Sequence, residues 1–533
     1  MTLKIKNIKM KLQNLLVTSV LFLSYTGIAQ DVDPDIINWY NGKKYGMCTD
    51  MAYKKLLKGK KAETVIVAVL DSGTDLEHED LQAIIWTNKG EIADNGIDDD
   101  KNGYIDDVHG WNFLGNASGE NINDVQLEKT RLYVKLGKEF EGKSESDISA
   151  DRKNDFKTYQ AVKTEVESEI KQAKATIAQI KPIQEKFSAP HDRLVKHFGR
   201  EFTADDLASL AGTDLEKDGE MFKKLFDQGA SYGYFEKVIE HYESSLSCHL
   251  NTELDARKIV GDNPEDFSDT KYGNNDSEGP DALHGSHCSG IIAAIRGNGL
   301  GGDGVADNVL IMPIRAVPNG DERDKDIALG IRYAVDNGAQ VINMSFGKKY
   351  SPQSEEVIKA IRYAEAKGVL CVHAAGNAGL LTDDQVNNGN FPAPQFPSMS
   401  SRFTNWIEVG ASTRYKKNLA ASFSNYGTKT VDVFAPGLEI YNTGPQGEYI
   451  TIQGTSMAAP MVAGLAALLK GYFPELTMIQ IKEIIFQSVK DVSKKTTTIP
   501  GGEEEIKFGE LSSTGGIVNT YNAVKLAKKK TKK

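Results

Sequence analysis

Cysteine is scarce in this sequence, and no hydrophobic run long enough to cross a membrane follows the first 30 residues. The 533 residues include four cysteines. Cys288 and Cys371 lie in apolar segments and are predicted to be small core side chains rather than disulfide partners. Cys48 and Cys248 remain, and their spacing does not show whether their backbones approach closely enough to pair. The lack of a further apolar run excludes a second membrane segment.

The sequence also has no excess of positive charge. Lysine and arginine number 63 and aspartate and glutamate 74, which gives a net charge of −11 and argues against general nucleic-acid binding. The basic stretch at 527–533 is interpreted as a solvated tail. With 40% hydrophobic residues, the chain can bury a large core and is predicted to hold one large domain with one sizeable addition.

The first 29 residues have the pattern of a signal peptide. Four lysines precede an apolar run, and small residues follow it (Lys4, Lys6, Lys9 and Lys11; 15–23; 27–29). The run is shorter than the roughly 20 residues of a membrane-spanning helix, so cleavage after Ala29 is predicted. No cysteine follows the run closely, which argues against lipid attachment. The mature protein is therefore expected to be secreted or periplasmic.

Four short segments carry reactive side chains in the order Asp, His, Asn, Ser. They are VAVLDSGTD with Asp71, HGSHCSG with His284, HAAGNAG with Asn377 and GTSMAAP with Ser456. A serine hydroxyl becomes a nucleophile when a base takes its proton and a third group orients that base. His284 is the predicted base and Asp71 the orienting group. The Asn377 amide, with the backbone N–H of Ser456 at a helix N-terminus, is predicted to bind the oxyanion.

With these segments the chain resembles the subtilases, the subtilisin-like serine endopeptidases. The resemblance runs from about residue 64 to 119 and from about 272 to 526, and subtilisin has the same chain order of Asp, His and Ser. It implies hydrolysis of peptide bonds through an acyl-enzyme intermediate, with proteins or peptides as substrates. We expect no nucleic-acid partner, no membrane association once the signal peptide is removed, and a monomer.

The resemblance also outlines a substrate cleft. Ser345, Phe346 and Gly347 correspond to the segment that pairs with substrate backbone and lines the primary pocket. Asn390 is predicted to approach the bottom of that pocket. Residues 319–324 correspond to the opposite edge of the cleft, where their charged side chains suggest a polar distal pocket.

The apolar segments predict an α/β fold, a subtilisin-like doubly wound parallel sheet with helices on both faces. Largely apolar runs alternate with helical stretches, as expected of parallel strands that are covered on both faces. The runs are 64–70, 309–317, 339–345, 369–375 and 406–412. Asp71 ends the first run and Asn377 follows the fourth, and open α/β sheets place their sites at such strand ends.

An inserted α-helical subdomain is predicted between Asp71 and His284, because the two side chains must meet although they lie far apart in the chain. Residues 121–269 are charged, and apolar positions step by three or four along 159–180. Pro182 and Pro190 are expected to end that helix. The insert is either a helical hairpin that packs on itself or an exosite, lid or substrate-gating element. The apolar positions are Tyr159, Val162, Val166, Ile170, Ala173, Ile177 and Ile180.

Before the insert, the segment NGIDDDKNGYIDD resembles the early part of a calcium loop. Alternate carboxylates converge on a hard cation, and a backbone carbonyl completes such a set. His109 stands where an EF-hand has its bidentate Glu, so a solvated acidic turn is the alternative. Because many subtilases are calcium-stabilised, the resemblance favours a structural Ca²⁺, and no organic cofactor is expected. The predicted ligands are Asp98, Asp100, Asn102, Tyr104, Asp106 and Asp107.

These segments give a predicted domain map: a signal peptide at 1–29, an N-terminal arm at 30–63, a peptidase domain at 64–120 and 270–526, the helical insert at 121–269 and the basic tail at 527–533. The stretch between 30 and 64 is too short for the folded pro-domain common in subtilases. We therefore expect folding without a cleaved chaperone segment, and no secretion or adhesion domain after 526.

Two other function classes remain open from the sequence. One is a subtilase fold kept as a binding module, against which the intact set of four reactive residues argues. The other is a Ser-Glu-Asp carboxyl peptidase active in acid, against which His284 and Asn377 argue. Within the fold, an aminopeptidase or tripeptidyl variant is a further possibility, because the insert can block one end of the cleft.

Overall fold

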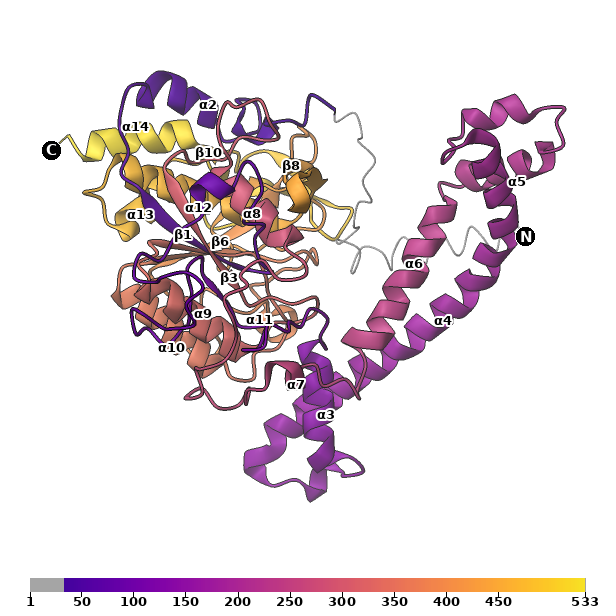
Figure 1. The fold of residues 1–533 in the computed structure, drawn as a ribbon, viewed down its shortest axis with the longest axis horizontal. Helices are drawn as coiled ribbons and strands as arrows, with labels where there is room; N and C mark the ends of the chain where they lie inside the picture. Colours follow the sequence, from indigo (N-terminus) through magenta and orange to yellow (C-terminus); the bar gives the residue numbers. More distant parts are fainter. Residues whose placement is uncertain (1–32, 533) are drawn as a thin grey trace. The chain divides into compact units, whose positions relative to one another are not determined.

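The structure, a computed structural model, describes residues 33–532 and divides the chain into two compact units. One, here called the sheet unit, contains the described residues up to Asn123 and from Ala256 onward, and the other, the helical unit, contains Asp124–Asp255 (Figure 1). The predicted signal peptide, 1–29, lies outside the described residues. The predicted domain limits stay a prediction, and residues 256–269, which we assigned to the insert, group with the sheet.

Within residues 33–532, the sheet unit is built on a nine-stranded sheet with the order β10-β13-β7-β6-β5-β4-β1-β3-β2. Its strands pair in parallel, except that β10 and β13 are antiparallel. This confirms the predicted α/β class. The strands are β1 (Val65–Asp71), β2 (Trp111–Asn112), β3 (Val309–Arg315), β4 (Val341–Met344), β5 (Leu370–Ala374), β6 (Trp406–Ser412), β7 (Val433–Pro436), β10 (Lys490–Asp491) and β13 (Gly516–Ile517).

Two further strand pairs lie outside this sheet. An antiparallel hairpin joins β8 (Ile440–Thr443) to β9 (Tyr449–Ile452), and another joins β11 (Thr496–Thr498) to β12 (Glu505–Lys507).

Helices cover both faces of the sheet (Figure 1). The helices α9 and α10 lie on one face, and α8, α12, α13 and α14 lie on the other. The strands are almost wholly buried, which explains why they are apolar along their length rather than alternating. The helices are α8 (Leu283–Ala293), α9 (Asp324–Asp336), α10 (Ser354–Ala366), α12 (Thr455–Tyr472), α13 (Met478–Gln487) and α14 (Thr520–Lys530), with the short α2 (Thr49–Ala52), α7 (Arg257–Val260) and α11 (Gln385–Asn388).

The central helix of the sheet unit is α12. It is apolar on every side and therefore needs cover all round, and every residue from Thr455 to Leu469 is buried. It packs across β1, β4, β5, β6 and β7 and against α8. The core thus holds the N-terminal turn of α12 rigidly beneath the carboxyl ends of the strands.

Residues 38–57 pack on the rest of the sheet unit. The Tyr40 side chain is fully buried, its hydroxyl donates to the carbonyl oxygen of Asp303 at 2.9 Å, and it accepts from Asn442 Nδ2 at 2.9 Å. Thr49 and Thr520 share a buried hydroxyl–hydroxyl bond of 3.0 Å. This segment is therefore part of the folded core.

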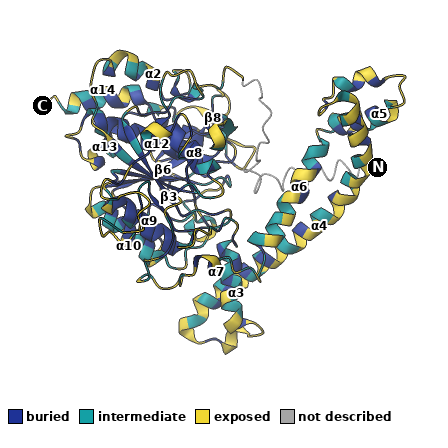
Figure 2. Cartoon of the chain, in the orientation of Figure 1, coloured by how far each residue is buried: buried dark blue, intermediate teal, exposed yellow. Residues whose placement is uncertain are grey.

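The helical unit contains α3 (Glu128–Phe140), α4 (Lys153–Phe198), α5 (Glu216–Asp227) and α6 (Tyr232–Ser244). The helix α4 packs against α3 and along α6. Its buried side chains form one stripe, whereas its other faces are exposed (Figure 2). Of the predicted apolar positions, 170 and 177 are half-buried and the other five are buried.

The prediction that Pro182 and Pro190 end this helix is wrong, because α4 continues through both to Phe198. A proline removes one backbone donor and costs about 3 kcal/mol inside a helix. The buried stripe continues past Pro182 with Pro190 and Leu194, so packing offsets that cost. Gly199, with φ 69°, ends the helix in the left-handed conformation.

All four cysteines are free thiols, and Cys288 and Cys371 are fully buried core side chains, as predicted. Among residues 33–532, no helix combines the length and the apolar character needed to span a membrane.

Candidate active site

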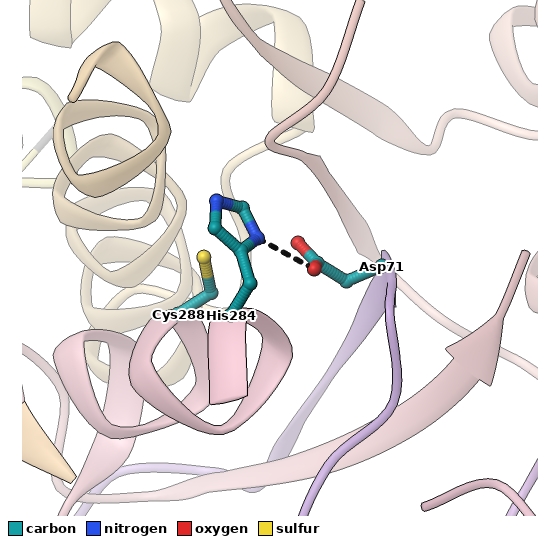
Figure 3. A group of neighbouring side chains, drawn as sticks. All are labelled: Asp71, His284 and Cys288. Atoms are coloured by element: carbon teal, nitrogen blue, oxygen red, sulfur yellow. Dashed lines mark hydrogen bonds and ion pairs between the residues drawn. The ribbon is translucent and has the colours of Figure 1, made fainter. Parts of the chain in front are cut away.

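Asp71 and His284 meet at the carboxyl end of β1. Asp71 is the last residue of β1 and is 1% exposed, and His284 is the second residue of α8. His284 Nδ1 lies 2.6 Å from Asp71 Oδ1, and Figure 3 draws this bond between the two side chains. The backbone N–H of Ser72 donates to the same oxygen at 2.7 Å. The carboxylate is thereby fixed in one orientation and holds the imidazole.

The electrostatics of this pair favour a charged imidazole. Burial by itself lowers the pKa of His284, but the adjacent Asp71 carboxylate, through charge and hydrogen bonding, outweighs burial, with a smaller contribution from Asp281. The pKa of His284 is therefore raised above its usual value. Such an imidazole is a good acceptor for a proton taken from a nearby hydroxyl.

Two glycines allow α8 to approach the end of β1. A Cβ on Gly285 would lie 1.9 Å from the carbonyl oxygen of Gly73. Gly73 itself has φ 124°, and a Cβ there would lie 1.9 Å from the carbonyl oxygen of Glu278. Any larger residue at either position would push His284 away from Asp71.

Ser456 is the second residue of α12 and is 9% exposed. Its hydroxyl donates to the carbonyl oxygen of Ser345 at 2.9 Å. Its own carbonyl oxygen accepts from the Ser345 hydroxyl at 2.8 Å and from Cys288 Sγ at 3.4 Å. These contacts are possible because Pro460, four residues on, has no N–H with which to satisfy that carbonyl. This role of Ser345 and Pro460 was not predicted from the sequence.

The Asn377 side chain follows β5 and is anchored by the residue before Ser456. Asn377 Oδ1 accepts from the backbone N–H of Thr455 at 2.8 Å and from its hydroxyl at 2.9 Å. Its Nδ2 is thus turned toward Gly454: a Cβ at Gly454 would lie 3.4 Å from Asn377 Nδ2 and 3.5 Å from Ser456 N. Two N–H donors therefore flank one small space that a side chain at 454 would fill.

Cys288, on α8, lies beside Asp71 and His284 (Figure 3). Ligand atoms of Asp71, His284 and Cys288 all lie within 4.8 Å of one another. Burial, reinforced by the Asp71 charge, raises the pKa of the Cys288 thiol well above its usual value. Because the thiolate is the reactive form, this buried thiol is a poor nucleophile.

The predicted substrate residues lie together next to Ser456. Ser345, Phe346 and Gly347 follow β4 directly, and Asn390 Nδ2 donates to the carbonyl oxygen of Ala374 at 3.0 Å. A Cβ on Gly347 would lie 2.4 Å from Asn390 Oδ1, and one on Gly376 3.3 Å from it. The Asn390 amide therefore occupies the space between two glycines, one after β4 and one after β5.

The predicted polar distal pocket stays a prediction, and two of its four charged side chains, Glu322 and Asp324, are buried. Glu322 is 2% and Asp324 3% exposed. Lys348 Nζ lies 2.9 Å from Asp324 Oδ1 and donates to the carbonyl oxygen of Glu322 at 2.8 Å. Burial raises the pKa of Glu322 to about 8, although Lys348 opposes this. The segment is thus tied internally to Lys348, next to Gly347, and only Asp321 and Arg323 are partly exposed.

The acidic segment before the helical unit forms a carboxylate cluster around Asp107. Glu91, Asp100 and Asp107 each place an oxygen within 4.8 Å of the others. Asp107 is fully buried and accepts from Tyr333 at 2.6 Å, Asn88 at 2.8 Å and Asn102 at 3.0 Å. Burial raises its pKa to about 6. Glu91 lies outside the predicted loop and was not among the predicted ligands.

The other predicted ligands have different surroundings. The Asp98 carboxylate accepts from the backbone N–H groups of Asn102 and Gly103, and the Asp106 carboxylate accepts from those of Asn95 and Gly96. The Tyr104 ring packs edge-on against Trp111 and Tyr333. These side chains shape the loop around the cluster of Glu91, Asp100 and Asp107.

Comparison with known proteins finds similarity to proteolytic enzymes along most of the chain. The model of the subtilase family matches residues 62–503. The thermophilic serine proteinase of Bacillus sp. (strain AK1) is 38% identical over 277 residues, 52% of this chain and 59% of that protein. Thermitase of Thermoactinomyces vulgaris is 42% identical over 187 residues, 35% of this chain and 60% of that protein. The cell wall-associated protease of Bacillus subtilis (strain 168) is 36% identical over 258 residues, 47% of this chain and 26% of that protein. The chain thus spans less than two thirds of the length of each of these relatives.

Proposed function

The chain belongs to the subtilase family, and we propose that it is a serine endopeptidase that hydrolyses peptide bonds through an acyl-enzyme intermediate. The observation that carries the proposal is the pair of donors, Asn377 Nδ2 and Ser456 N, beside the Ser456 hydroxyl in the unit that also joins His284 to Asp71 at 2.6 Å. A hydroxyl nucleophile, an oriented base and an oxyanion site are the three parts that acyl transfer requires.

In this mechanism the Ser456 hydroxyl leaves the Ser345 carbonyl and attacks the substrate carbonyl carbon while its proton passes to His284. Asp71 holds the imidazole and stabilises the imidazolium that forms. The negative charge on the substrate oxygen is stabilised by Asn377 Nδ2 and Ser456 N. His284 then gives its proton to the leaving amine as the peptide bond breaks. Water, deprotonated by His284, hydrolyses the acyl-enzyme and restores the Ser456 hydroxyl.

We propose that Ser345, Phe346 and Gly347 bind the substrate backbone and that Asn390 closes the primary pocket. The support is that the Asn390 amide lies between Gly347 and Gly376. A carboxamide there leaves a short pocket with a polar end, which favours small or hydrogen-bonding side chains over large apolar ones. The substrates would be proteins or peptides, and the enzyme a secreted or periplasmic monomer.

A structural Ca²⁺ fits the cluster of Glu91, Asp100 and Asp107. Hard cations take carboxylate oxygens, and the buried Asp107, whose pKa burial raises to about 6, would gain from a nearby positive charge. The predicted residues Asp98, Asn102, Tyr104 and Asp106 would shape the loop or complete the ligand set. A bound ion would link the loop at 88–107 to α9 through the hydrogen bond between Tyr333 and Asp107.

The proposal is tested with a fluorophosphonate probe and casein hydrolysis, in calcium, on the chain from Gln30 and on Ser456→Ala. We expect labelling to vanish and kcat to fall by about 10⁶, the size of effect that loss of the nucleophile has in subtilisin. Cys371→Ala, at a fully buried thiol in β5, is the matched control and should keep both labelling and hydrolysis. A folded wild-type chain that is not labelled would contradict the proposal and favour the binding module.

The pH profile separates this function from an acid carboxyl peptidase. The base must be neutral to accept a proton, so kcat/KM should rise with pH as His284 loses its charge. Because Asp71 raises the pKa of His284, the midpoint of that rise should lie above the ordinary histidine value of about 6.5. Maximal activity in acid would point to the carboxyl peptidase instead.

A further inference from the structure

A fully buried arginine stands beside the catalytic Asp71. Arg315 is the last residue of β3, and the parallel register pairs it with Asp71, the last residue of β1. Its side chain is 0% exposed, among the largest side chains that are fully buried in the described residues. The roles proposed above for the reaction do not use it.

Neutral acceptors hold the Arg315 guanidinium. Its Nε donates to the carbonyl oxygen of Ser72 at 3.0 Å, its Nη1 to Asn112 Oδ1 at 3.0 Å and its Nη2 to the carbonyl oxygen of Ile122 at 2.6 Å. Burial lowers its pKa to about 10, although Asp276 and Asp281 oppose this, so it stays charged at neutral pH. Burying a cation on carbonyl and amide oxygens is costly, which suggests that the position of the guanidinium matters.

The space for the guanidinium exists because residue 279 is a glycine. A Cβ on Gly279 would lie 2.1 Å from Arg315 Nε, so the side chain rests directly on the backbone there. Gly279 has φ 67°, which also favours glycine. The guanidinium thus has one position, set by three acceptors and by this contact.

One residue links the arginine to the reacting groups. The Ser72 carbonyl accepts from Arg315, and the Ser72 N–H donates to Asp71 Oδ1 at 2.7 Å, the same oxygen that binds His284 Nδ1. We propose that Arg315 is a positioning residue that fixes Ser72 and, through its N–H, the orientation of the Asp71 carboxylate toward His284. This inference rests on the proposed function.

The other two acceptors of Arg315 belong to the segment that leads to the helical unit. Asn112 and Ile122 lie on that segment, which ends at Asn123, where the chain leaves the sheet unit. That segment also binds near β3, since Asn319 N donates to the carbonyl oxygen of Asn123 at 2.8 Å. Through one guanidinium, Arg315 therefore ties this segment to the end of the strand that carries Asp71.

Kinetics of Arg315→Met and Arg315→Lys on a small peptide amide test the proposal. A misplaced catalytic group costs up to about a hundredfold in rate, so we expect kcat of Arg315→Met to fall by about tenfold to a hundredfold with KM unchanged. Lysine keeps the positive charge but cannot donate the same three hydrogen bonds in the planar geometry of a guanidinium. Arg315→Lys should therefore recover part of kcat. It is the informative variant if Arg315→Met does not fold. A folded variant with wild-type kcat, or with a change in KM alone, would overturn the proposal.

A double-mutant cycle asks whether Arg315 acts through Asp71. If it does, Arg315→Met should have little effect on the residual rate of fluorophosphonate labelling in an Asp71→Asn background, because the orientation is already lost. An equal fold-change in both backgrounds would mean a general structural role and would refute the proposal. Arg257→Met, which removes another buried cation of the sheet unit, is the matched control and should lower stability while leaving kcat intact.

A spectroscopic readout separates failure of this inference from failure of the proposed function. The proton between His284 Nδ1 and Asp71 should give a downfield proton resonance in the wild-type chain, whether or not the chain hydrolyses peptides. We expect Arg315→Met or Arg315→Lys to shift or broaden it. An unchanged resonance contradicts the positioning role, whereas absence of labelling in wild type contradicts only the peptidase proposal.

Discussion

The helices α12 and α4 show how differently the two units are held together. In the sheet unit α12 is buried on every side from Thr455 to Leu469, whereas in the helical unit α4 buries one stripe and exposes the rest (Figure 2). The difference follows from residue pattern, because a uniformly apolar helix needs cover all round and an amphipathic one needs a single partner face. A helix buried on all sides, such as α12, holds a reactive residue in one position, whereas α4 is held through one face only. Both helices contain proline, Pro460 in α12 and Pro182 and Pro190 in α4.

Ion pairs show the same contrast. In the sheet unit Arg257 and Asp326 form a bidentate pair with side chains 4% and 0% exposed, and Lys325 and Asp262 are both 0% exposed. In the helical unit Arg193–Asp218 and Arg200–Asp206 have arginines more than half exposed, whereas both side chains of Arg131–Glu128 are 9% exposed. Exposed pairs contribute about 0–1 kcal/mol, whereas removal of one partner of a buried pair is strongly destabilising. The buried pairs of the sheet unit therefore depend on specific partners, whereas most ion pairs of the helical unit add little to the contribution of its apolar stripe.

Within the comparison of the two units, the largest effect is expected where the fixed geometry of the sheet unit serves the proposed chemistry, although it is smaller than the effect of removing the Ser456 hydroxyl. Removal of an oxyanion amide lowers kcat in subtilisin by about 10²–10³, and we expect a loss of that size for Asn377→Ala because Thr455 holds the Asn377 amide in place. Steady-state kinetics on a peptide amide measure it. Asn405→Ala removes another buried asparagine of the sheet unit and should leave kcat unchanged; equal losses in both variants would argue against the oxyanion role.

Matched leucine substitutions in α12 and α4 test whether α12 is the more completely packed helix. Leu465 on α12 and Leu194 on α4 are both fully buried, and leucine-to-alanine changes in cores cost about 2–5 kcal/mol. We expect Leu465→Ala near the upper end of that range, because its surroundings are closed on all sides, and Leu194→Ala near the lower end. Denaturant unfolding followed by circular dichroism gives both values. A larger loss of unfolding free energy for Leu194→Ala than for Leu465→Ala would contradict this difference in packing.

Calcium removal should affect one unit only. A ligand at a hundred times its Kd stabilises by about 2.7 kcal/mol, and each kcal/mol shifts Tm by about 2–4 °C in a domain of about 150–250 residues and by less in a larger one. We expect a chelator to lower the melting transition of the sheet unit by several degrees and to leave that of the helical unit in place. Asp107→Asn should abolish the effect of the chelator on Tm. An unchanged Tm of the wild-type chain in chelator would contradict a structural Ca²⁺ at this cluster.

The smallest effect is expected from loss of the helical unit. The chain enters and leaves it at one place, since Leu127 N donates to the carbonyl oxygen of His249 at 3.1 Å, so 124–255 can be replaced by a short Gly/Ser linker. The deletion should stop at 255, because Arg257 and Asp262 form buried ion pairs in the sheet unit. We expect hydrolysis of small peptide amides to be unchanged. Casein hydrolysis then distinguishes the two readings of the insert: unchanged for a hairpin that packs on itself, reduced for an exosite or gate.

Much of the sheet unit was predictable from the sequence because its signals are local. The five predicted strands coincide with β1, β3, β4, β5 and β6 to within a few residues, since continuous apolar runs between turns have few other ways to be buried. The placement of Asp71 at a strand end and of Ser456 at a helix start was predictable for the same reason. The end of α4 was not, because packing beyond Pro182 outweighed the local cost of proline.

The fold class, the family and the order of the reactive residues follow from short segments, because their chemistry and periodicity are legible without the fold. Which distant groups meet depends on tertiary contacts. The tertiary structure joined Glu91 to Asp100 and Asp107, turned Glu322 and Asp324 inward onto Lys348, and placed Arg315 on the carbonyl of Ser72. Such contacts arise from strand order and helix packing, which bring together residues far apart in the chain. The local sequence around each residue therefore does not indicate them.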